Sequence, residues 1–308
     1  MGAVPYRGLR LRRAVSVLSI FSVVVALGVV APALATAASA STGPVTGNAR
    51  NGTYLALGDS VAFGYVPPDA TPAPNYYDAH SFISYANDVA QALDERVFNA
   101  SCPGETTGSM LYPGAQSNGC ENSVTGSPGY RTSYPLHVQY EGTQMAYALQ
   151  FLRDHKNTHL VTIDIGANDA FVCEATTVNH CTTATELGTV LRQIETNLTA
   201  IFTQLRSVYS GPLVVLDYYS LTYKTLRQEE LSLLLNSFIN AAATGLTVVI
   251  ATGFSAFEVA SAPYDGSPCA AGLLIPIPGG KCNIHPTHYG HQVLAKAILS
   301  ALTTAGDM

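Results

Sequence analysis

"YLALGDSVAFGY", residues 54–65, joins a short apolar run to Gly-Asp-Ser and breaks at a second glycine, Gly64. A run of this length that stops at a glycine is typical of a buried strand followed by a tight turn. Ser60 would then stand just after the carboxyl end of a strand. Serine is also a common turn residue, so this stretch alone assigns Ser60 no chemical role.

The apolar runs that follow alternate with segments of helical periodicity. They are rich in Val, Ile and Leu, which is typical of parallel strands covered on both faces. We therefore predict an α/β fold, a three-layer α/β/α sandwich with a central, mostly parallel sheet of about five strands. The first helix would begin on a Ser81 cap and bury Ile83. Expected strands are residues 53–58, 96–101, 159–166, 211–220 and 246–253, and expected helices are residues 81–95, 142–155, 185–209, 227–245 and 287–305.

The N-terminus has the pattern of a secretory signal peptide. Four arginines within residues 7–13 precede an apolar stretch from residue 14 to about residue 31, and small residues follow. This order predicts a signal peptide over residues 1–40, cleaved after Ala35 or Ala40. An uncleaved anchor is the alternative, but the apolar stretch is short for a full membrane span. We expect a secreted, extracellular protein.

The rest of the chain is expected to contain a flexible lead-in, residues 41–52, and one domain, residues 53–308. The 308 residues carry a formal net charge of −6, and only 12% of them are charged, about half the usual fraction. The sequence has no basic run outside the leader, which argues against a nucleic-acid partner. We expect a monomer.

Six cysteines in an exported chain indicate disulfides. Fifteen connectivities are formally allowed. Pairing of sequence neighbours is the simplest, and each bridge would then close one loop rich in Gly, Ser or Thr. Zinc is the competing interpretation, but the sequence has no C-x-x-C pair. The predicted disulfides are Cys102–Cys120, Cys173–Cys181 and Cys269–Cys282.

Polar residues and glycines follow three of the expected strands, and a histidine precedes the last helix. In this fold class such segments meet at the edge formed by the carboxyl ends of the strands. Ser60 can supply a nucleophilic hydroxyl and His285 a base. The backbone N–H groups of Ser60 and Gly104 and the side-chain amide of Asn168 can donate to an oxyanion. A glycine at position 104 would let the backbone approach a ligand closely.

With these four segments the chain resembles the SGNH hydrolases, also called the GDSL esterase/lipase family. The first block of that family is matched by residues 58–60 with Gly64, and the second by Gly104. The third block, G-x-N-D, is matched by residues 166–169, and the fourth by His285-Pro286. The resemblance implies a flavodoxin-like fold and ester hydrolysis through a Ser60 acyl-enzyme. It implies no cofactor and no metal.

One position departs from the family pattern. The fourth block usually reads D-x-x-H, and here Cys282 stands three residues before His285. Some relatives use a main-chain carbonyl in place of the aspartate that orients the histidine. The resemblance therefore implies a Ser60–His285 dyad in which His285 Nδ1–H donates to a main-chain oxygen. A carboxylate farther along the chain is the alternative, with Asp265 as the first candidate.

Several other polar and aromatic residues have simpler explanations. Asp59 and Asp169 are expected to shape their loops through hydrogen bonds. The spacing H-x-x-H-x-x-H that begins at His285 suggests metal, but three such positions on a helix turn through a wide arc and have no acidic neighbour. Tyrosines near the expected site could line an acyl crevice or serve general packing; they are Tyr65, Tyr76, Tyr77, Tyr112 and Tyr130.

We predict a secreted carboxylic-ester hydrolase of the esterase/lipase type. Its substrate would be a small-molecule or lipid ester, with transient contact to a lipid surface. A carbohydrate-ester deacetylase or a phospholipase of the same fold is the alternative, because the chemistry is shared. A non-catalytic secreted binding module is the rival from another functional class. The residues discussed above do not determine the preferred acyl length or alcohol.

Overall fold

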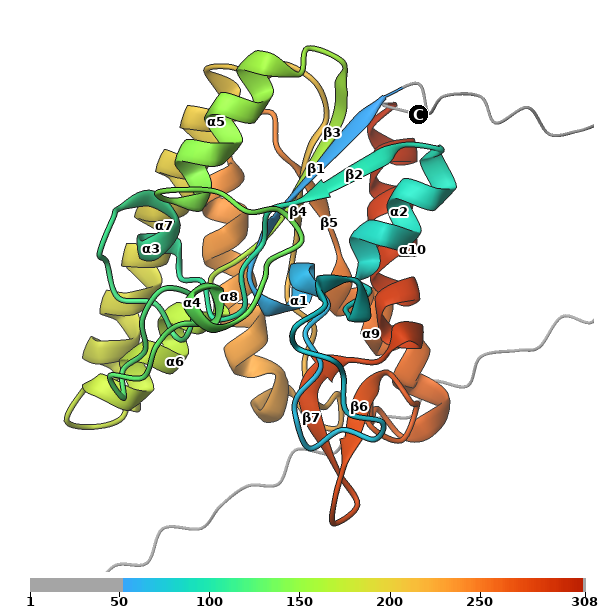
Figure 1. Cartoon of the computed structure of the whole chain (residues 1–308). Coiled ribbons are helices and arrows are strands. Elements are labelled where there is room, and N and C mark those ends of the chain that lie inside the picture. The colour runs from blue at the N-terminus through green and yellow to red at the C-terminus, as the bar shows by residue number, and fades with distance from the viewer. Residues whose placement is uncertain (1–51, 307–308) are drawn as a thin grey trace, which may run out of the picture. The chain divides into compact units, whose positions relative to one another are not determined.

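The computed structural model describes residues 52–306, which form a parallel sheet of five strands between two helical layers (Figure 1). The strand order is β2-β1-β3-β4-β5, and every neighbouring pair is parallel. This confirms the predicted fold class. The predicted signal peptide and nearly all of the lead-in lie outside the described residues. The strands are β1 (Thr53–Gly58), β2 (Arg96–Asn99), β3 (Thr158–Asp164), β4 (Leu213–Leu216) and β5 (Val249–Ala251).

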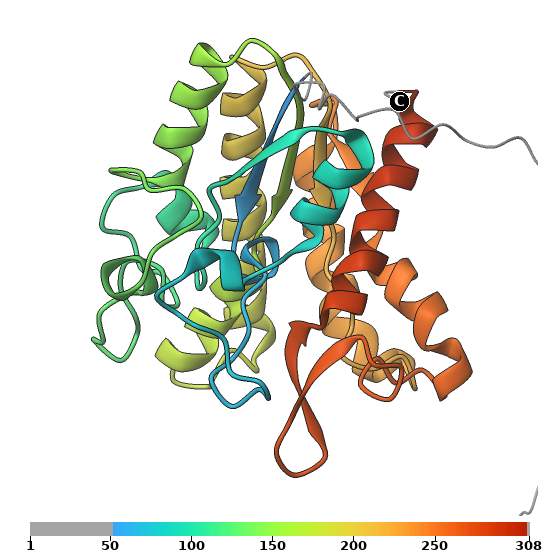
Figure 2. The ribbon, with the colours of Figure 1, turned by 45° about the vertical axis from the view of Figure 1, so that its right-hand side comes forward.

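Strands β1 and β4 are buried along their whole length and consist mainly of apolar residues, because both faces of the sheet are covered. In β1, Leu55 and Leu57 belong to a core built with α5, α7 and α8, whereas Tyr54 and Ala56 belong to a core built with α2, α9 and α10. Figure 1 shows these two groups of helices on opposite sides of the sheet, and in Figure 2 the green α5 and the red α10 lie on opposite sides of the strands. The helices are α2 (Tyr85–Leu93), α5 (Gln144–Asp154), α7 (Ala184–Arg206), α8 (Leu226–Ala243), α9 (Gly253–Ser261) and α10 (His288–Ala305).

The start of α2 differs from the prediction. Ser84, not Ser81, caps the helix, and its side chain accepts a hydrogen bond from the N–H of Ala86 at 3.2 Å. Asn87 Oδ1 accepts a hydrogen bond from the N–H of Ser84 at 3.0 Å, which completes a capping box. Ile83 therefore precedes the helix and is half exposed, so its expected burial was wrong.

Several short elements near the carboxyl edge of the sheet carry no periodic signal in the sequence. His285 lies in one of them, the antiparallel hairpin β6–β7, rather than in a plain approach to the last helix. The hairpin lies at the carboxyl edge of the sheet in Figure 1. These elements are α1 (Ser60–Phe63), α3 (Thr107–Leu111), α4 (Tyr130–Ser133), α6 (Ala167–Thr176), β6 (Leu274–Ile277) and β7 (Lys281–Pro286), with single 3₁₀ turns at Ala79–Ser81 and Ala262–Tyr264.

Each of the six cysteines is paired with its neighbouring cysteine in the sequence, as predicted. The bridges are Cys102–Cys120, Cys173–Cys181 and Cys269–Cys282. The first closes the long loop after β2, and the third ties the start of β7 to the segment before β6. Within residues 52–306, no helix is both long and apolar enough to cross a membrane.

Candidate active site

A cavity of about 570 Å³ at the carboxyl edge of the sheet is lined by all four residues that the sequence singles out. Ser60 comes from the start of α1, directly after β1, and Gly104 from the loop after β2. Asn168 stands in the first turn of α6, and His285 comes from β7. The chain thus brings together residues that are 225 positions apart in sequence.

The β1–α1 turn presents Ser60 to the hairpin. Asp59 caps α1, and its Oδ1 accepts a hydrogen bond from the N–H of Val61 at 3.0 Å. Gly64 ends this short helix in a left-handed conformation, φ 82°, which glycine adopts without strain. In this setting Ser60 Oγ lies 2.9 Å from His285 Nε2, within hydrogen-bond distance.

The side chain of Asn283 contacts the other nitrogen of the His285 ring. Asn283 Oδ1 accepts a hydrogen bond from the backbone N–H of His285 at 3.1 Å and lies 2.5 Å from His285 Nδ1. Since a backbone N–H can only donate, the Asn283 atom that faces it must be the oxygen. That oxygen can only accept, so Nδ1 carries the ring proton. Nε2 is then left to accept from the hydroxyl of Ser60.

This contact corrects the prediction for the partner of His285. A main-chain carbonyl was expected, and the structure places a side-chain amide oxygen there. The other candidate, Asp265, is almost fully exposed and lies 3.3 Å from Lys224 Nζ. Asn283 was missed, although the sequence carries a local signal for it. Asparagine readily bonds the backbone two residues onward, and Asn283 stands two residues before His285.

The surroundings of His285 favour its neutral form. Burial lowers the pKa of the His285 imidazole to about 4, because a charged ring loses its hydration there. The ring of Tyr65 lies against it, with the two ring centroids 5.0 Å apart. Tyr219 OH donates to the carbonyl of Ile284 at 2.7 Å and holds the strand between Asn283 and His285. The imidazole is therefore both held in place and uncharged at neutral pH.

Asn168 is fixed on both sides of its amide. Its Nδ2 donates to Asp59 Oδ2 at 3.1 Å, and its Oδ1 accepts from Asn118 Nδ2 at 2.9 Å. A primary amide carries two N–H donors, so one remains for a substrate oxygen. Asn118 comes from the long loop after β2. It was not predicted, because no neighbouring residue in the sequence indicates its contact with Asn168.

The two aspartates expected to shape loops are held by hydrogen bonds. Asp59 Oδ2 also accepts from Tyr218 OH at 2.7 Å, and burial raises the pKa of Asp59 to about 6. Asp169 accepts from the N–H of Thr107 at 2.9 Å and from its Oγ1 at 2.6 Å. Asp169 therefore ties the start of α6 to the start of α3.

The backbone around Gly104 gives a reason for a glycine that the sequence did not indicate. Its φ is +83°, and a Cβ built on it would lie 2.6 Å from the carbonyl oxygen of Asn118. The N–H of Asn118 also donates to the carbonyl of Gly104 at 2.7 Å. The glycine thus accommodates the returning loop that carries Asn118. Gly104 also lines the cavity, and close approach of a ligand to its backbone stays a prediction.

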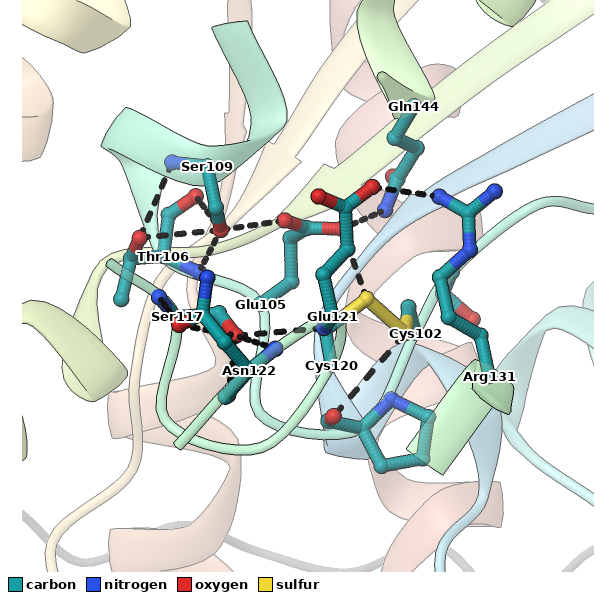
Figure 3. The surroundings of a disulfide bond; sticks show 12 residues. Cys102, Glu105, Thr106, Ser109, Ser117, Cys120, Glu121, Asn122, Arg131 and Gln144 are labelled. Atoms are coloured by element: carbon teal, nitrogen blue, oxygen red, sulfur yellow. Dashed lines mark hydrogen bonds and ion pairs between the residues drawn. A yellow bond between two sulfur atoms is a disulfide. The ribbon is translucent and has the colours of Figure 1, made fainter. Parts of the chain in front are cut away.

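Glu105, next to Gly104, is buried beside a disulfide. Figure 3 shows it near Cys102–Cys120, between Ser109 and Gln144. Ser109 Oγ donates to Glu105 Oε1, and Gln144 Nε2 donates to Oε2 at 3.2 Å. Burial raises the pKa of Glu105 to about 8, since the charged form would lose its hydration without a cation against it.

Apart from the polar groups described above, the cavity is lined mainly by apolar and aromatic side chains. Of the tyrosines noted in the sequence, Tyr65 and Tyr130 line it, whereas Tyr77 and Tyr112 are more than half exposed. Tyr76 packs against the rings of both Tyr65 and Tyr130, with centroids 6.0 and 6.3 Å away. Apolar residues that line the cavity and are also exposed come from four segments; they are Phe171, Leu221, Leu231 and Ile284.

The three histidines of the H-x-x-H-x-x-H pattern have different partners. His285 faces Ser60, as described above. His288 Nε2 lies 3.0 Å from Gln292 Nε2. His291 is buried, and its Nδ1 accepts from the N–H of Tyr85 at 3.3 Å. The pattern is thus divided between the cavity and the packing of α10 against α2.

Comparison with known proteins agrees with this geometry. The model of the GDSL-like lipase/acylhydrolase family matches residues 56–293. The chain belongs to this family. The match includes all four residues that line the cavity and that the sequence singled out, so the family resemblance inferred from their blocks is confirmed.

Solved structures of other hydrolases share the fold at low identity. Phospholipase A1 from Streptomyces albidoflavus NA297 is 20% identical with a TM-score of 0.51, over 82% of this chain and 99% of that one. LAE5, an α/β hydrolase enzyme from the metagenome of Lake Arreo, is 15% identical with a TM-score of 0.52, over 83% and 97%. No curated protein sequence matches this chain.

Proposed function

We propose that this GDSL-family protein is an exported carboxylic-ester hydrolase that works through an acyl-enzyme on Ser60. The observation that carries the proposal is the 2.9 Å contact between Ser60 Oγ and His285 Nε2, at the wall of an apolar cavity. A serine becomes a nucleophile when a base accepts its proton at this distance. The three disulfides are compatible with export.

In the first step, Ser60 Oγ attacks the ester carbonyl carbon while its proton passes to His285 Nε2. The carbonyl oxygen becomes an oxyanion, for which the N–H groups of Ser60 and Gly104 and the free donor of Asn168 are the proposed partners. The tetrahedral intermediate collapses, and the leaving alcohol takes the proton from Nε2. Water then attacks the acyl-enzyme with His285 as base, releases the acid and restores Ser60.

The cavity supports esters with an apolar acyl chain as substrates. A pocket of about 570 Å³ with leucine, phenylalanine and tyrosine walls would accept methylene groups and has few partners for sugar hydroxyls. Phe171, Leu221, Leu231 and Ile284 extend this apolar lining to the surface, which fits brief contact with a lipid surface. A lipid ester is thus favoured over a carbohydrate ester.

A series of p-nitrophenyl esters, from acetate to palmitate, tests this proposal. We expect kcat/KM to rise with acyl length until the cavity is full, because each buried methylene contributes about 0.8 kcal/mol, or roughly fourfold. An Ala170→Phe variant, which adds a ring to the lining of the cavity, should shorten the preferred chain. Equal kcat/KM for all lengths would refute the acyl assignment.

The Ser60→Ala variant is the control for the chemistry in this series. It should fold like the wild type and hydrolyse none of the esters, because no other group in the proposed mechanism forms the acyl-enzyme. Hydrolysis at the wild-type rate by this variant would show that another group performs the reaction. A wild-type protein that binds the esters without turnover would instead be the non-catalytic binding module.

A further inference from the structure

We propose that Asn283 is the positioning residue of this site, a neutral amide that takes the place of the family's aspartate in holding and orienting the His285 ring. This inference rests on the proposed function, because it assigns how the base of that mechanism is oriented. Asn283 does not touch the substrate in this account and acts only through His285.

Two hydrogen bonds to one acceptor atom carry the inference. Asn283 Oδ1 accepts from the backbone N–H of His285 at 3.1 Å and lies 2.5 Å from its Nδ1. The first bond determines which end of the amide faces His285, and the second fixes the ring tautomer. The lone pair of His285 Nε2 therefore points toward Ser60, as a general base requires.

Asn283 is itself firmly placed. Cys282, its neighbour, is bridged to Cys269, and the next residue, Ile284, receives the 2.7 Å hydrogen bond from Tyr219. Cys282 also pairs with Pro276 across the β6–β7 hairpin. The disulfide thus stands where the family has its aspartate, and the residue beside it supplies the acceptor.

A neutral acceptor has a chemical consequence that an aspartate does not share. A carboxylate beside Nδ1 stabilises the imidazolium and raises the pKa of the histidine, whereas an amide adds no charge. Among the described residues that line the cavity, Asp59 is the only carboxylic acid, and it accepts from Asn168 and Tyr218. The titratable side chains beside His285 are Tyr65, whose ring centroid lies 5.0 Å from that of His285, and His291, whose pKa is lowered to about 3 by burial. The base should therefore stay neutral, and active, in moderately acidic solution.

The test compares Asn283→Ala with Asn283→Asp through full pH profiles of kcat and kcat/KM on a soluble p-nitrophenyl ester. Loss of the acceptor in Asn283→Ala should lower kcat on the order of 10- to 100-fold, part of what a general base supplies, with KM little changed. Asn283→Asp keeps an oxygen that can accept both hydrogen bonds. It should retain a high kcat and move the acidic limb of the profile up by about one pH unit or more.

Exposed Lys281, on the same strand, provides the matched control, and Lys281→Ala should match the wild type in rate and profile. Asp59 is unchanged in every variant, so a shift between profiles reports position 283. The inference is overturned if Asn283→Asp leaves the acidic limb where it is, which a merely structural role predicts, or if Asn283→Ala keeps kcat within twofold. The Ser60→Ala variant distinguishes a failure of the proposed function from a failure of the role of Asn283. If Ser60→Ala stays active, the proposed function fails, whatever the Asn283 variants do.

Discussion

At the residue scale, the segment around Gly104 contains a buried carboxylic acid, and among the described residues no charged group contacts it. Glu105 is 2% exposed, and its nearest polar contacts are Ser109, Gln144 and the sulfur of Cys120 at 3.3 Å from Oε2. Gln144 in turn binds both the N–H and the carbonyl of Gly58, at 2.6 and 3.0 Å. The protonated acid therefore connects the loop after β2 to the end of β1, next to Ser60.

The raised pKa of Glu105 predicts a pH dependence of stability. Between about 4.5 and about 8, the folded protein keeps a proton that the unfolded chain has released. The folded state binds more protons in this range, so the free energy of unfolding falls as pH rises through it, by an amount on the order of a few kcal/mol.

Urea unfolding between pH 5 and pH 9 measures this effect. A Glu105→Gln variant cannot titrate at this position, so it should lose much of the decline and exceed the wild type in stability above pH 8. Exposed Glu141→Gln is the control and should keep the wild-type slope. Equal slopes for the wild type and Glu105→Gln would show that Glu105 is ionised in the folded protein.

Some residues of the candidate site could be predicted from the sequence, and others could not. Ser60, Gly104, Asn168 and His285 could be grouped because each stands near the end of a strand or the start of the last helix, and chain order alone brings such positions to one edge. Asn118 could not be found in this way. It lies inside a long loop, and its partner Asn168 is 50 positions away, so only the folded path of that loop joins them.

At the scale of elements, the β6–β7 hairpin carries half of the proposed catalytic pair. Its disulfide, Cys269–Cys282, spans 13 positions, and Cys282 directly precedes Asn283. In the hairpin, Leu274 pairs with Pro286 and Ile277 with Lys281. This element therefore determines how His285 approaches Ser60.

Removal of this disulfide should affect both stability and rate. In a Cys269→Ser/Cys282→Ser double variant, the unfolded chain regains the freedom of a loop of this length, and stability should fall by about 3 kcal/mol. The rate constant kcat should also fall, because the hairpin carries the base. Thermal unfolding and ester kinetics on the same samples measure the two effects.

The matched control is Cys173→Ser/Cys181→Ser, which removes the bridge at the far end of α6, eight positions in span. It should lower stability but leave kcat near the wild-type value. An equal loss of kcat in both double variants would contradict a specific role for the hairpin.

Elements differed in how well their sequence predicts them. The helices α7 and α10 lie within a few residues of their expected bounds, because apolar residues that recur with helical spacing over many turns clearly indicate a helix. By contrast, α1, α3 and α4 span four or five residues, too few for a period. Side chains cap α1 and α3 but not α4. The β6–β7 hairpin has glycines at its turn, but its strands are short and carry Pro276 and Pro286, which obscure the strand signal.

At the scale of the whole molecule, one sheet serves both folding and chemistry. The helical layers pack against its two apolar faces, and the cavity lies at its carboxyl edge. The fold could be predicted from the sequence because burial of both faces leaves short runs rich in apolar residues, such as the Leu-Val-Val-Leu of β4, separated by helical segments. The size and apolar lining of the cavity could not, since they arise from α6, α7, α8 and β7 meeting in three dimensions.

The central claim is that Ser60 is the nucleophile of this cavity, activated by His285. Reaction with a fluorophosphonate tests it directly, because a serine nucleophile displaces fluoride and keeps the phosphonyl group, which peptide mass spectrometry can locate. We predict one label per chain, on Ser60, with much slower labelling in His285→Ala and none in Ser60→Ala. A label on another residue, or full ester hydrolysis by a protein that takes up no label, would contradict the account.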